Sequence, residues 1–236
     1  MTTENTRNGK AMIYFNLFTV IVLFFLFGCS KSDTVTTIQY GNVSDFEGNK
    51  YRTVAIGNQV WMAENLRSEK LNNGTAIPLV TDNNTWSNMT TPAYSFYSND
   101  SVSYKNSYGV LYNWYTVQTG KLCPSGWHIP SDTEFTTLST TLGVDSVAGG
   151  MLKFNAALWV SPNTYATNST GFTALPSGYR NYNGSFNSSA GYLAAFWSST
   201  EYGSYSKYIY LTYNSGTIGR KNTDKENGLS VRCLKD

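Results

Sequence analysis

Histidine is almost absent from this sequence, since His128 is the only one among 236 residues. One imidazole cannot build the multi-histidine sites that hold catalytic zinc or iron, and it leaves a single candidate for a histidine base. Charge is also scarce, because only 14% of the residues are Asp, Glu, Lys or Arg, against about a quarter in typical soluble domains. The 17 basic and 15 acidic residues nearly cancel, so the chain lacks the cationic surplus of a nucleic-acid-binding protein.

Aromatic residues are abundant, with 18 Tyr, 12 Phe and 6 Trp. They supply enough apolar area for a folded core, which excludes an intrinsically disordered chain. Asn, Ser, Thr, Gly and Tyr take the place of charged residues along the whole chain. This composition suits an extracellular protein that binds polar ligands.

The N-terminal segment predicts export and lipidation. Two basic residues precede an apolar run over residues 11–28, and Gly28 comes directly before Cys29. A basic stretch, an apolar stretch and a small residue before the cut are typical of a secretory signal peptide, and the cysteine that follows resembles a bacterial lipobox. We therefore expect residues 1–28 to be removed and Cys29 to carry the lipid, with an uncleaved membrane anchor as the alternative.

The remainder of the chain predicts a tether followed by one domain. Residues 29–43 are polar and show no periodicity, as expected of a lipid-anchored tether. Residues 44–236 are long enough for a single domain with a sizeable core. Ser30, which stands where inner-membrane lipoproteins carry aspartate, resembles the residue of lipoproteins sorted to the outer membrane. We expect the protein at the cell outer membrane, with its periplasmic or surface side left open.

The number of cysteines predicts one disulfide. Once Cys29 is assigned to lipid, Cys123 and Cys233 are the two that remain, and in an oxidising compartment a disulfide is the default for such a pair. It would fasten the C-terminal strand to the middle of the chain. A reactive thiol pair would need a C-x-x-C context or a depressed pKa, and the sequence indicates neither.

The first half of the domain predicts a hairpin followed by loops. Residues 45–56 and 59–66 alternate as two strands around a Gly-Asn turn, which indicates a β-hairpin. Residues 68–106 are rich in Asn, Ser, Thr and Asp and predict long loops, and residues 109–120 predict a short helix.

The second half predicts a capped helix followed by strands. Ser131 and Glu134 have the spacing of a capping box, Phe135 begins the apolar face of the helix, and Gly143 ends it. Sheet segments around one or two helices indicate an α+β fold. The later strands are expected over residues 172–180, 193–198, 207–213, 217–220 and 229–234.

Several motifs occur in a fixed order: DFEGNKYRTVAIGNQVWMAENLR (45–67), GVLYNWYTV (109–117), CPSGWHIPSDTEF (123–135) and FWSSTEY (196–202), before a terminal SVRCLKD (230–236). Together they resemble the Fibrobacter succinogenes major paralogous domain over residues 43–236. That resemblance implies a secreted or lipid-anchored protein, of the kind found largely in Bacteroidetes and related bacteria.

A more distant resemblance concerns the fold. The segment GWHIPSDTEF is similar to the strand–turn–helix of C-type-lectin-like domains and formylglycine-generating enzymes, and FWSST with a terminal V-R-C resembles later strands of that superfold. This implies a C-type-lectin-like fold of mostly antiparallel strands and hairpins with one or two short helices. It also implies that the Cys123–Cys233 bridge joins the region before the helix to the last strand.

The enzymes of that superfold indicate what catalysis would require. Formylglycine-generating enzymes use two active-site cysteines, whereas Cys123 and Cys233 are expected to be structural, and related sulfoxide synthases use several histidines. His128 lies directly before a buried helix start, where a packed, hydrogen-bonded role is favoured over catalysis. We therefore expect no catalytic residues. The alternative is an envelope enzyme, either formylglycine-generating-like or a hydrolase that uses Asp132 or Glu201.

Calcium-dependent sugar binding is not favoured. The E-P-N, Q-P-D and W-N-D tripeptides of calcium-dependent C-type lectins do not occur in the sequence. The oxygen-rich stretch with Asp224, Glu226 and Asn227 is a weak calcium candidate, and a solvated hairpin connection is the favoured interpretation of it. We expect no cofactor.

Aromatic side chains can bind sugars without calcium, by stacking on C–H faces while amides and arginine supply hydrogen bonds. The best candidate is the predicted turn with Tyr179, Arg180, Asn181 and Tyr182, and Trp159 is the next; core packing is the alternative for each. The sequence thus predicts a non-catalytic lectin-like domain that binds a glycan or a protein partner and no nucleic acid. A self-associating structural protein of the envelope is a further alternative. The tryptophans assigned to the core are Trp61, Trp114, Trp127 and Trp197.

Overall fold

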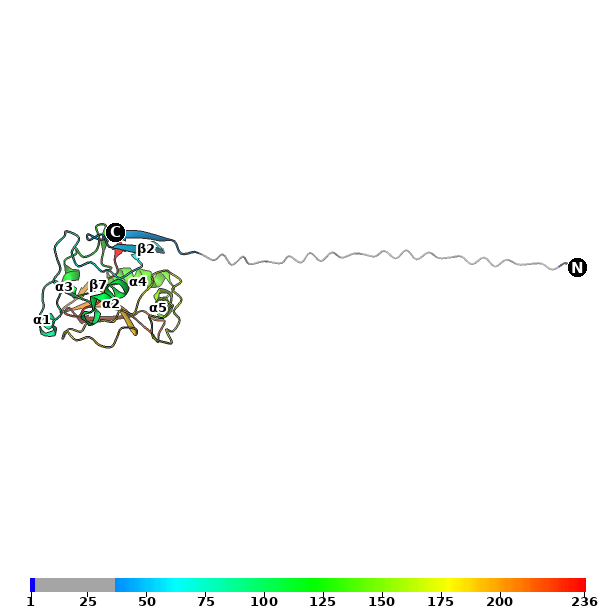
Figure 1. The fold of residues 1–236 in the computed structure, drawn as a ribbon. Coiled ribbons are helices and arrows are strands. Elements are labelled where there is room, and N and C mark those ends of the chain that lie inside the picture. The colour runs from blue at the N-terminus through cyan, green and yellow to red at the C-terminus, as the bar shows by residue number, and fades with distance from the viewer. Residues whose placement is uncertain (3–36) are drawn as a thin grey trace. The chain divides into compact units, whose positions relative to one another are not determined.

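The computed structural model describes residues 1–2 and 37–236, and all of the described helices and strands lie within residues 37–236 (Figure 1). Most of the predicted signal peptide, Cys29 and the first part of the predicted tether lie outside the described residues. No helix in the described part of the chain has both the length and the apolar character needed to cross a bilayer.

Short helices and strands are interleaved with long irregular segments, so the fold is α+β as predicted. In chain order the elements are β1 (Tyr40–Ser44), β2 (Lys50–Ile56), β3 (Gln59–Met62), α1 (Asn83–Ser87), β4 (Tyr94–Ser95), the 3-10 turn η1 (Tyr97–Asn99), α2 (Ser101–Tyr108), β5 (Leu111–Tyr112), α3 (Trp114–Gln118), β6 (Trp127–His128), α4 (Asp132–Thr141), α5 (Asp145–Leu152), β7 (Leu193–Tyr202), β8 (Tyr205–Thr212), β9 (Gly219–Asp224) and β10 (Leu234–Lys235).

The five-stranded sheet has the order β1-β2-β3-β10-β6. The predicted hairpin is confirmed, because β2 and β3 pair antiparallel around Gly57, whose φ of +59° favours glycine. The tether was predicted to extend through residue 43, and this boundary is wrong: Tyr40–Ser44 form β1, which pairs with β2. The short polar strand carries little alternation, so the sequence pattern did not reveal it. The C-terminal β10 inserts between β3 and β6 and brings the two ends of the domain together.

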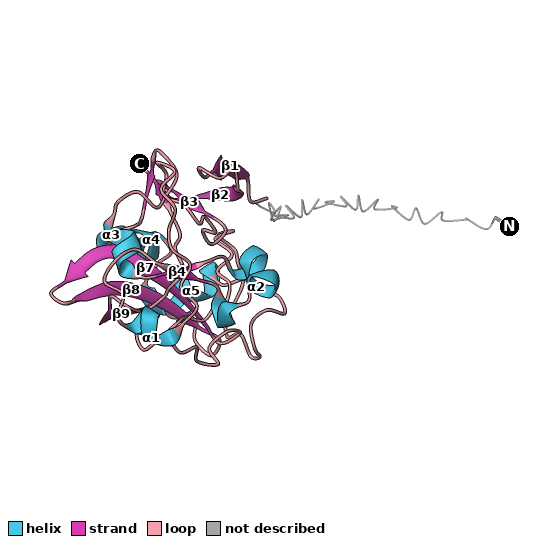
Figure 2. Ribbon diagram, turned by 60° about the vertical axis from the view of Figure 1, so that its left-hand side comes forward, coloured by secondary structure: helices cyan, strands magenta, loops and turns pink. Residues whose placement is uncertain are grey.

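A separate antiparallel sheet has the order β7-β8-β9 (Figure 2). Alternate residues point to opposite faces of a strand, so Phe196 and Ile209 enter one hydrophobic core while Trp197 and Tyr208 contact another. Each face of the sheet therefore contacts a hydrophobic core. The strand predicted over residues 172–180 is wrong, since that segment makes only isolated bridges.

Helix α4 begins as the sequence predicts. Ser131 accepts a hydrogen bond from the Glu134 amide, and the Glu134 carboxylate accepts one from the Ser131 amide. Helix α5 was not predicted, because Gly149 and Gly150 resemble a helix breaker in the sequence. A Cβ on Gly150 would lie 2.4 Å from the Tyr165 carbonyl oxygen, so glycine permits the helix to pack closely against that loop.

Three fully buried cations hold the irregular segments together: Lys153, Arg180 and Arg232. Their nitrogens donate to backbone carbonyls and side-chain amide oxygens rather than to carboxylates. Burial lowers the pKa of Lys153 to about 8, of Arg180 to about 10 and of Arg232 to about 9. Because each cation collects acceptors from segments distant in sequence, it holds those segments together.

The predicted disulfide is present. Cys123 and Cys233, which are 110 residues apart in sequence, form a bridge whose two residues are buried. It links the segment before β6 to the segment before β10, and these two strands also pair. The C-terminus is thus fixed both covalently and by hydrogen bonds.

Candidate functional site

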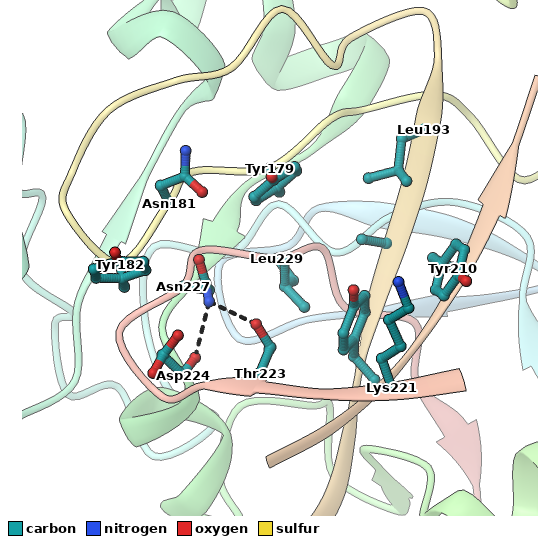
Figure 3. A pocket seen from close by; sticks show the side chains of 12 residues that line it. Tyr179, Asn181, Tyr182, Leu193, Tyr210, Lys221, Thr223, Asp224, Asn227 and Leu229 are labelled. Atoms are coloured by element: carbon teal, nitrogen blue, oxygen red, sulfur yellow. Dashed lines mark hydrogen bonds between the residues drawn. The ribbon is translucent and has the colours of Figure 1, made fainter. Parts of the chain in front are cut away.

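A cavity of about 280 Å³ lies on one face of the β7-β8-β9 sheet (Figure 3). The strands form its floor, and two irregular segments, 179–182 and 225–229, form its rim. The lining residues are Tyr179, Asn181, Tyr182, Leu193, Ala195, Tyr208, Tyr210, Lys221, Thr223, Asp224, Asn227 and Leu229.

Tyrosine rings form the apolar wall of the cavity. Tyr208 and Tyr210 share a face because they are two residues apart on β8, and their ring centroids are 5.8 Å apart at an interplanar angle of 34°. Burial, together with the nearby Tyr210 and Tyr179 hydroxyls, raises the pKa of Tyr208 to about 12. The phenol therefore stays neutral and remains a hydrogen-bond donor at physiological pH.

Two asparagines present amide oxygens at the rim. The Asn227 Nδ2 donates to Thr223 Oγ1 at 2.7 Å and to the Asp224 carbonyl, and the Asn181 Nδ2 donates to Asn187 Oδ1 at 2.8 Å. Neither Oδ1 accepts a hydrogen bond from the part of the chain that the structure describes. Because the amide nitrogens are held in place, both oxygens are fixed acceptors for ligand hydroxyls.

The two charged residues of the cavity lie at opposite ends. Lys221 lies beside Tyr210, with its Nζ 5.4 Å from the ring centroid, and Asp224 lies near Tyr182 (Figure 3). Between the two ends lie the aromatic wall and the amide rim. The cavity thus combines apolar faces, neutral acceptors and one charge of each sign.

The structure brings together three of the five predicted ligand-binding residues, Tyr179, Asn181 and Tyr182. Tyr179 is partly buried and its hydroxyl accepts a hydrogen bond from Asn187 at 2.8 Å. Tyr182 is 54% exposed at the rim. The predicted turn is therefore part of the cavity.

Arg180 was predicted to contact a ligand, and this prediction is wrong. Its side chain is fully buried and donates to the carbonyls of Val80, Thr81 and Gly184, while its guanidinium stacks 4.3 Å from the Trp86 ring centroid. Arginine in a turn usually reaches solvent, but here the guanidinium is drawn inward because these carbonyls accept its hydrogen bonds. Arg180 instead positions the cavity residues on either side of it.

Trp159 was also predicted as a ligand contact, and the structure contradicts this. It is 5% exposed, packs in the core with Phe172 and donates from Nε1 to the Ala174 carbonyl at 3.0 Å. Core packing, the alternative interpretation, is correct for this residue because the loop after it folds over α5 rather than over the cavity.

The three residues considered as calcium ligands make separate contacts. Asp224 lines the cavity, the Glu226 carboxylate accepts a hydrogen bond from the Tyr115 hydroxyl at 2.6 Å, and Asn227 turns its amide nitrogen toward Thr223. Within residues 37–236, no group of three or more His, Cys, Asp or Glu side chains is placed to hold a metal ion.

His128 bridges two carboxylates. Its Nδ1 lies 2.6 Å from Asp236 Oδ1 and its Nε2 lies 2.8 Å from Glu134 Oε1. Burial disfavours the imidazolium, but the hydrogen bonds and charges of Asp236 and Glu134 outweigh burial and raise the pKa of His128. A ring held between two carboxylates connects the start of α4 to the C-terminus.

The acidic residues weighed as catalysts are ion-paired. Asp132 contacts Lys207 at 2.7 Å and Arg220 at 3.1 Å, and Glu201 contacts Lys225. Each carboxylate thus has a structural counter-charge, and neither Asp132 nor Glu201 lines the tyrosine cavity.

Three cavity residues were not predicted as ligand contacts: Tyr208, Tyr210 and Lys221. The segment K-Y-I-Y-L-T-Y (207–213) carries the alternation of a strand with one aromatic face. That alternation could have indicated that Tyr208 and Tyr210 share one face of the strand. It could not have indicated that this face would remain partly open to solvent.

A family model described as the Fibrobacter succinogenes major domain matches residues 54–235, which confirms the resemblance inferred from the motifs. No curated protein and no solved structure matches the chain.

Proposed function

This chain belongs to the Fibrobacter succinogenes major domain family, and we propose that it is a non-catalytic protein of the cell envelope that binds carbohydrate. The observation that carries the proposal is the cavity on the β7-β8-β9 sheet, in which tilted tyrosine rings face fixed amide acceptors. Capture of a polysaccharide or adhesion to one is the expected role.

Sugar chemistry matches the lining of the cavity. A pyranose ring has an apolar C–H face, which gains free energy when it leaves water and packs against Tyr208 or Tyr210. Its hydroxyls need acceptors, and Asn181 and Asn227 offer oxygens already oriented by their own hydrogen bonds. Preorganised groups bind more tightly because less conformational freedom is lost.

We propose that the protein is exported and anchored by lipid at Cys29, at the outer membrane. What supports this is the apolar run before Gly28-Cys29 and the serine that follows. The lipid would hold the cavity near the membrane without a spanning segment.

We infer that the fold is C-type-lectin-like. In support, the GWHIPSDTEF segment forms β6, a turn and α4, and FWSST lies in β7. The disulfide joins the segment before α4 to the segment before β10, as the resemblance implies.

We propose a binding role rather than catalysis because the candidate catalysts have structural partners. The two cysteines weighed for formylglycine-generating chemistry are joined in a disulfide. His128 bridges Asp236 and Glu134, and the carboxylates of Asp132 and Glu201 pair with cations.

Replacing Tyr210 with alanine is expected to weaken polysaccharide binding by about tenfold or more, which corresponds to about 1.4 kcal/mol, because the stacking surface is removed. Binding is first found by screening the purified full-length protein against an array of neutral and acidic polysaccharides, and affinities are then measured by calorimetry. Tyr205→Ala is the matched control, since Tyr205 is 46% exposed on β8 but does not line the cavity.

Two outcomes would contradict the proposal. The first is an array on which no polysaccharide binds above background while a protein partner does. The second is a Tyr210→Ala variant that binds as tightly as the Tyr205→Ala variant.

A further inference from the structure

We propose that the cavity selects anionic sugars, and that Lys221 recognises their carboxylate. The inference rests on the proposed function, because it names the ligand class of the same cavity. It starts from the distribution of charge around the β8–β9 edge of the sheet.

Lys221 differs from the other cations near the β8–β9 edge of the sheet in its ion pairing. Lys207 and Arg220 pair with Asp132, and Lys225 pairs with Glu201. Lys221 forms no ion pair or side-chain hydrogen bond with any residue in the described ranges, and its Nζ lies over the Tyr210 ring. Its charge is therefore available to a ligand, whereas the neighbouring charges are neutralised.

The register of the sheet places this charge against the stacking surface. Lys221 lies directly opposite Tyr208 in the β8–β9 ladder, and residues directly opposite each other project from the same face. A sugar stacked on Tyr208 or Tyr210 would therefore bring a ring substituent within reach of the flexible lysine side chain. Because Lys221 is exposed, such an ion pair is sensitive to added salt.

Asp224 makes the two ends of the cavity differ in charge. It lies three residues from Lys221 along β9, a separation of about 10 Å in an extended strand, at the end of the cavity near Tyr182 (Figure 3). A negative charge there repels an anionic group and accepts hydrogen bonds from hydroxyls. The acidic ring of an oligosaccharide is thus directed to the Tyr210 end and a neutral part of the chain to the Tyr182 end.

A second cavity adjoins the first at the same lysine. Lys221 also lines a second space of about 340 Å³, together with Asp132, Tyr202, Lys207, Arg220 and Asn222. A sugar chain that leaves the tyrosine cavity past Lys221 would meet another exposed aromatic ring, since Tyr202 is 58% exposed. Two cavities that share Lys221 favour a polymer over a single sugar as the ligand.

The test compares sugars that differ only in charge. Oligomers of galacturonate, glucuronate and mannuronate are each titrated into the full-length protein beside their methyl esters, which keep the ring and remove the carboxylate charge. At low salt, at least one acid is expected to bind about tenfold more tightly than its ester, and added salt is expected to reduce that ratio.

Lys221→Gln is expected to remove the preference for the acid while leaving the affinity for the ester within twofold of the wild type. Lys121→Gln is the control, because Lys121 is exposed and does not line either cavity; it should keep the preference.

The outcomes separate this inference from the proposed function. Equal binding of every acid and its ester, or an unchanged preference in Lys221→Gln, overturns the inference while Tyr210-dependent binding still stands. If neither acids nor esters bind and no other glycan binds through Tyr210, both are overturned.

Discussion

Replacing Arg232 with methionine is expected to destabilise the domain by about 4 kcal/mol, because each buried acceptor left without a donor costs about 1–3 kcal/mol. The Arg232 guanidinium is fully buried and donates to Asn65 Oδ1 at 2.7 Å and to the Thr173 carbonyl at 2.8 Å. It also donates to the carbonyls of Met62 and Phe172. Methionine fills similar space but leaves all four oxygens unpaired.

Urea unfolding and thermal melts measure this effect, and the melting temperature should fall by about 10 °C for a domain of this size. Arg232→Lys should lie between wild type and Arg232→Met, because an ammonium can satisfy only some of the acceptors. Lys235→Met is the control, since Lys235 is exposed on β10 in the same C-terminal segment. A loss below about 1 kcal/mol in Arg232→Met would show that water or rearranged backbone supplies the missing donors.

Replacing Cys123 and Cys233 together with alanine is expected to cost about 4–5 kcal/mol, the value of the chain-entropy model for a loop of about 100 residues. The bridge closes 110 residues and fixes β10, which completes the five-stranded sheet. A reductant should lower the urea midpoint of the wild type to that of the double variant and leave the variant unchanged.

The double variant treated with reductant is the control for this experiment, because it has no bridge left to break. If the oxidised and reduced wild-type proteins unfold at the same urea concentration, the disulfide does not stabilise the domain. The effects of Arg232 and Cys233 should not be additive, because these neighbouring residues hold the same segment.

Local patterns predicted the parts of the fold that depend on neighbouring residues. The β2–β3 hairpin follows from alternation around a Gly-Asn turn, and the start of α4 follows from Ser131 and Glu134, three residues apart. The buried cations could not be predicted in this way. Arg180 donates to the carbonyls of Val80 and Thr81, about a hundred positions earlier, and only the folded chain brings them together.

Part of the candidate site was also predicted from a local pattern, and the rest depends on contacts between distant segments. A turn rich in tyrosine and asparagine indicated Tyr179, Asn181 and Tyr182, which do line the cavity. The opposite wall comes from β8 and β9, and whether Tyr208 is covered or open depends on packing between distant segments. Trp159 was misassigned because a tryptophan beside a loop has the same local sequence whether the loop covers it or leaves it open.

The most direct test of ligand binding in the cavity is protection of its tyrosines from nitration, read residue by residue by mass spectrometry. With the tightest-binding oligosaccharide at saturation, we expect the reactivity of Tyr182 and Tyr210 to fall. Tyr205, which lines neither cavity, is the internal reference and should react as before. Protection confined to residues outside the cavity, or none at Tyr182 and Tyr210 with ligand bound, would contradict the proposed site.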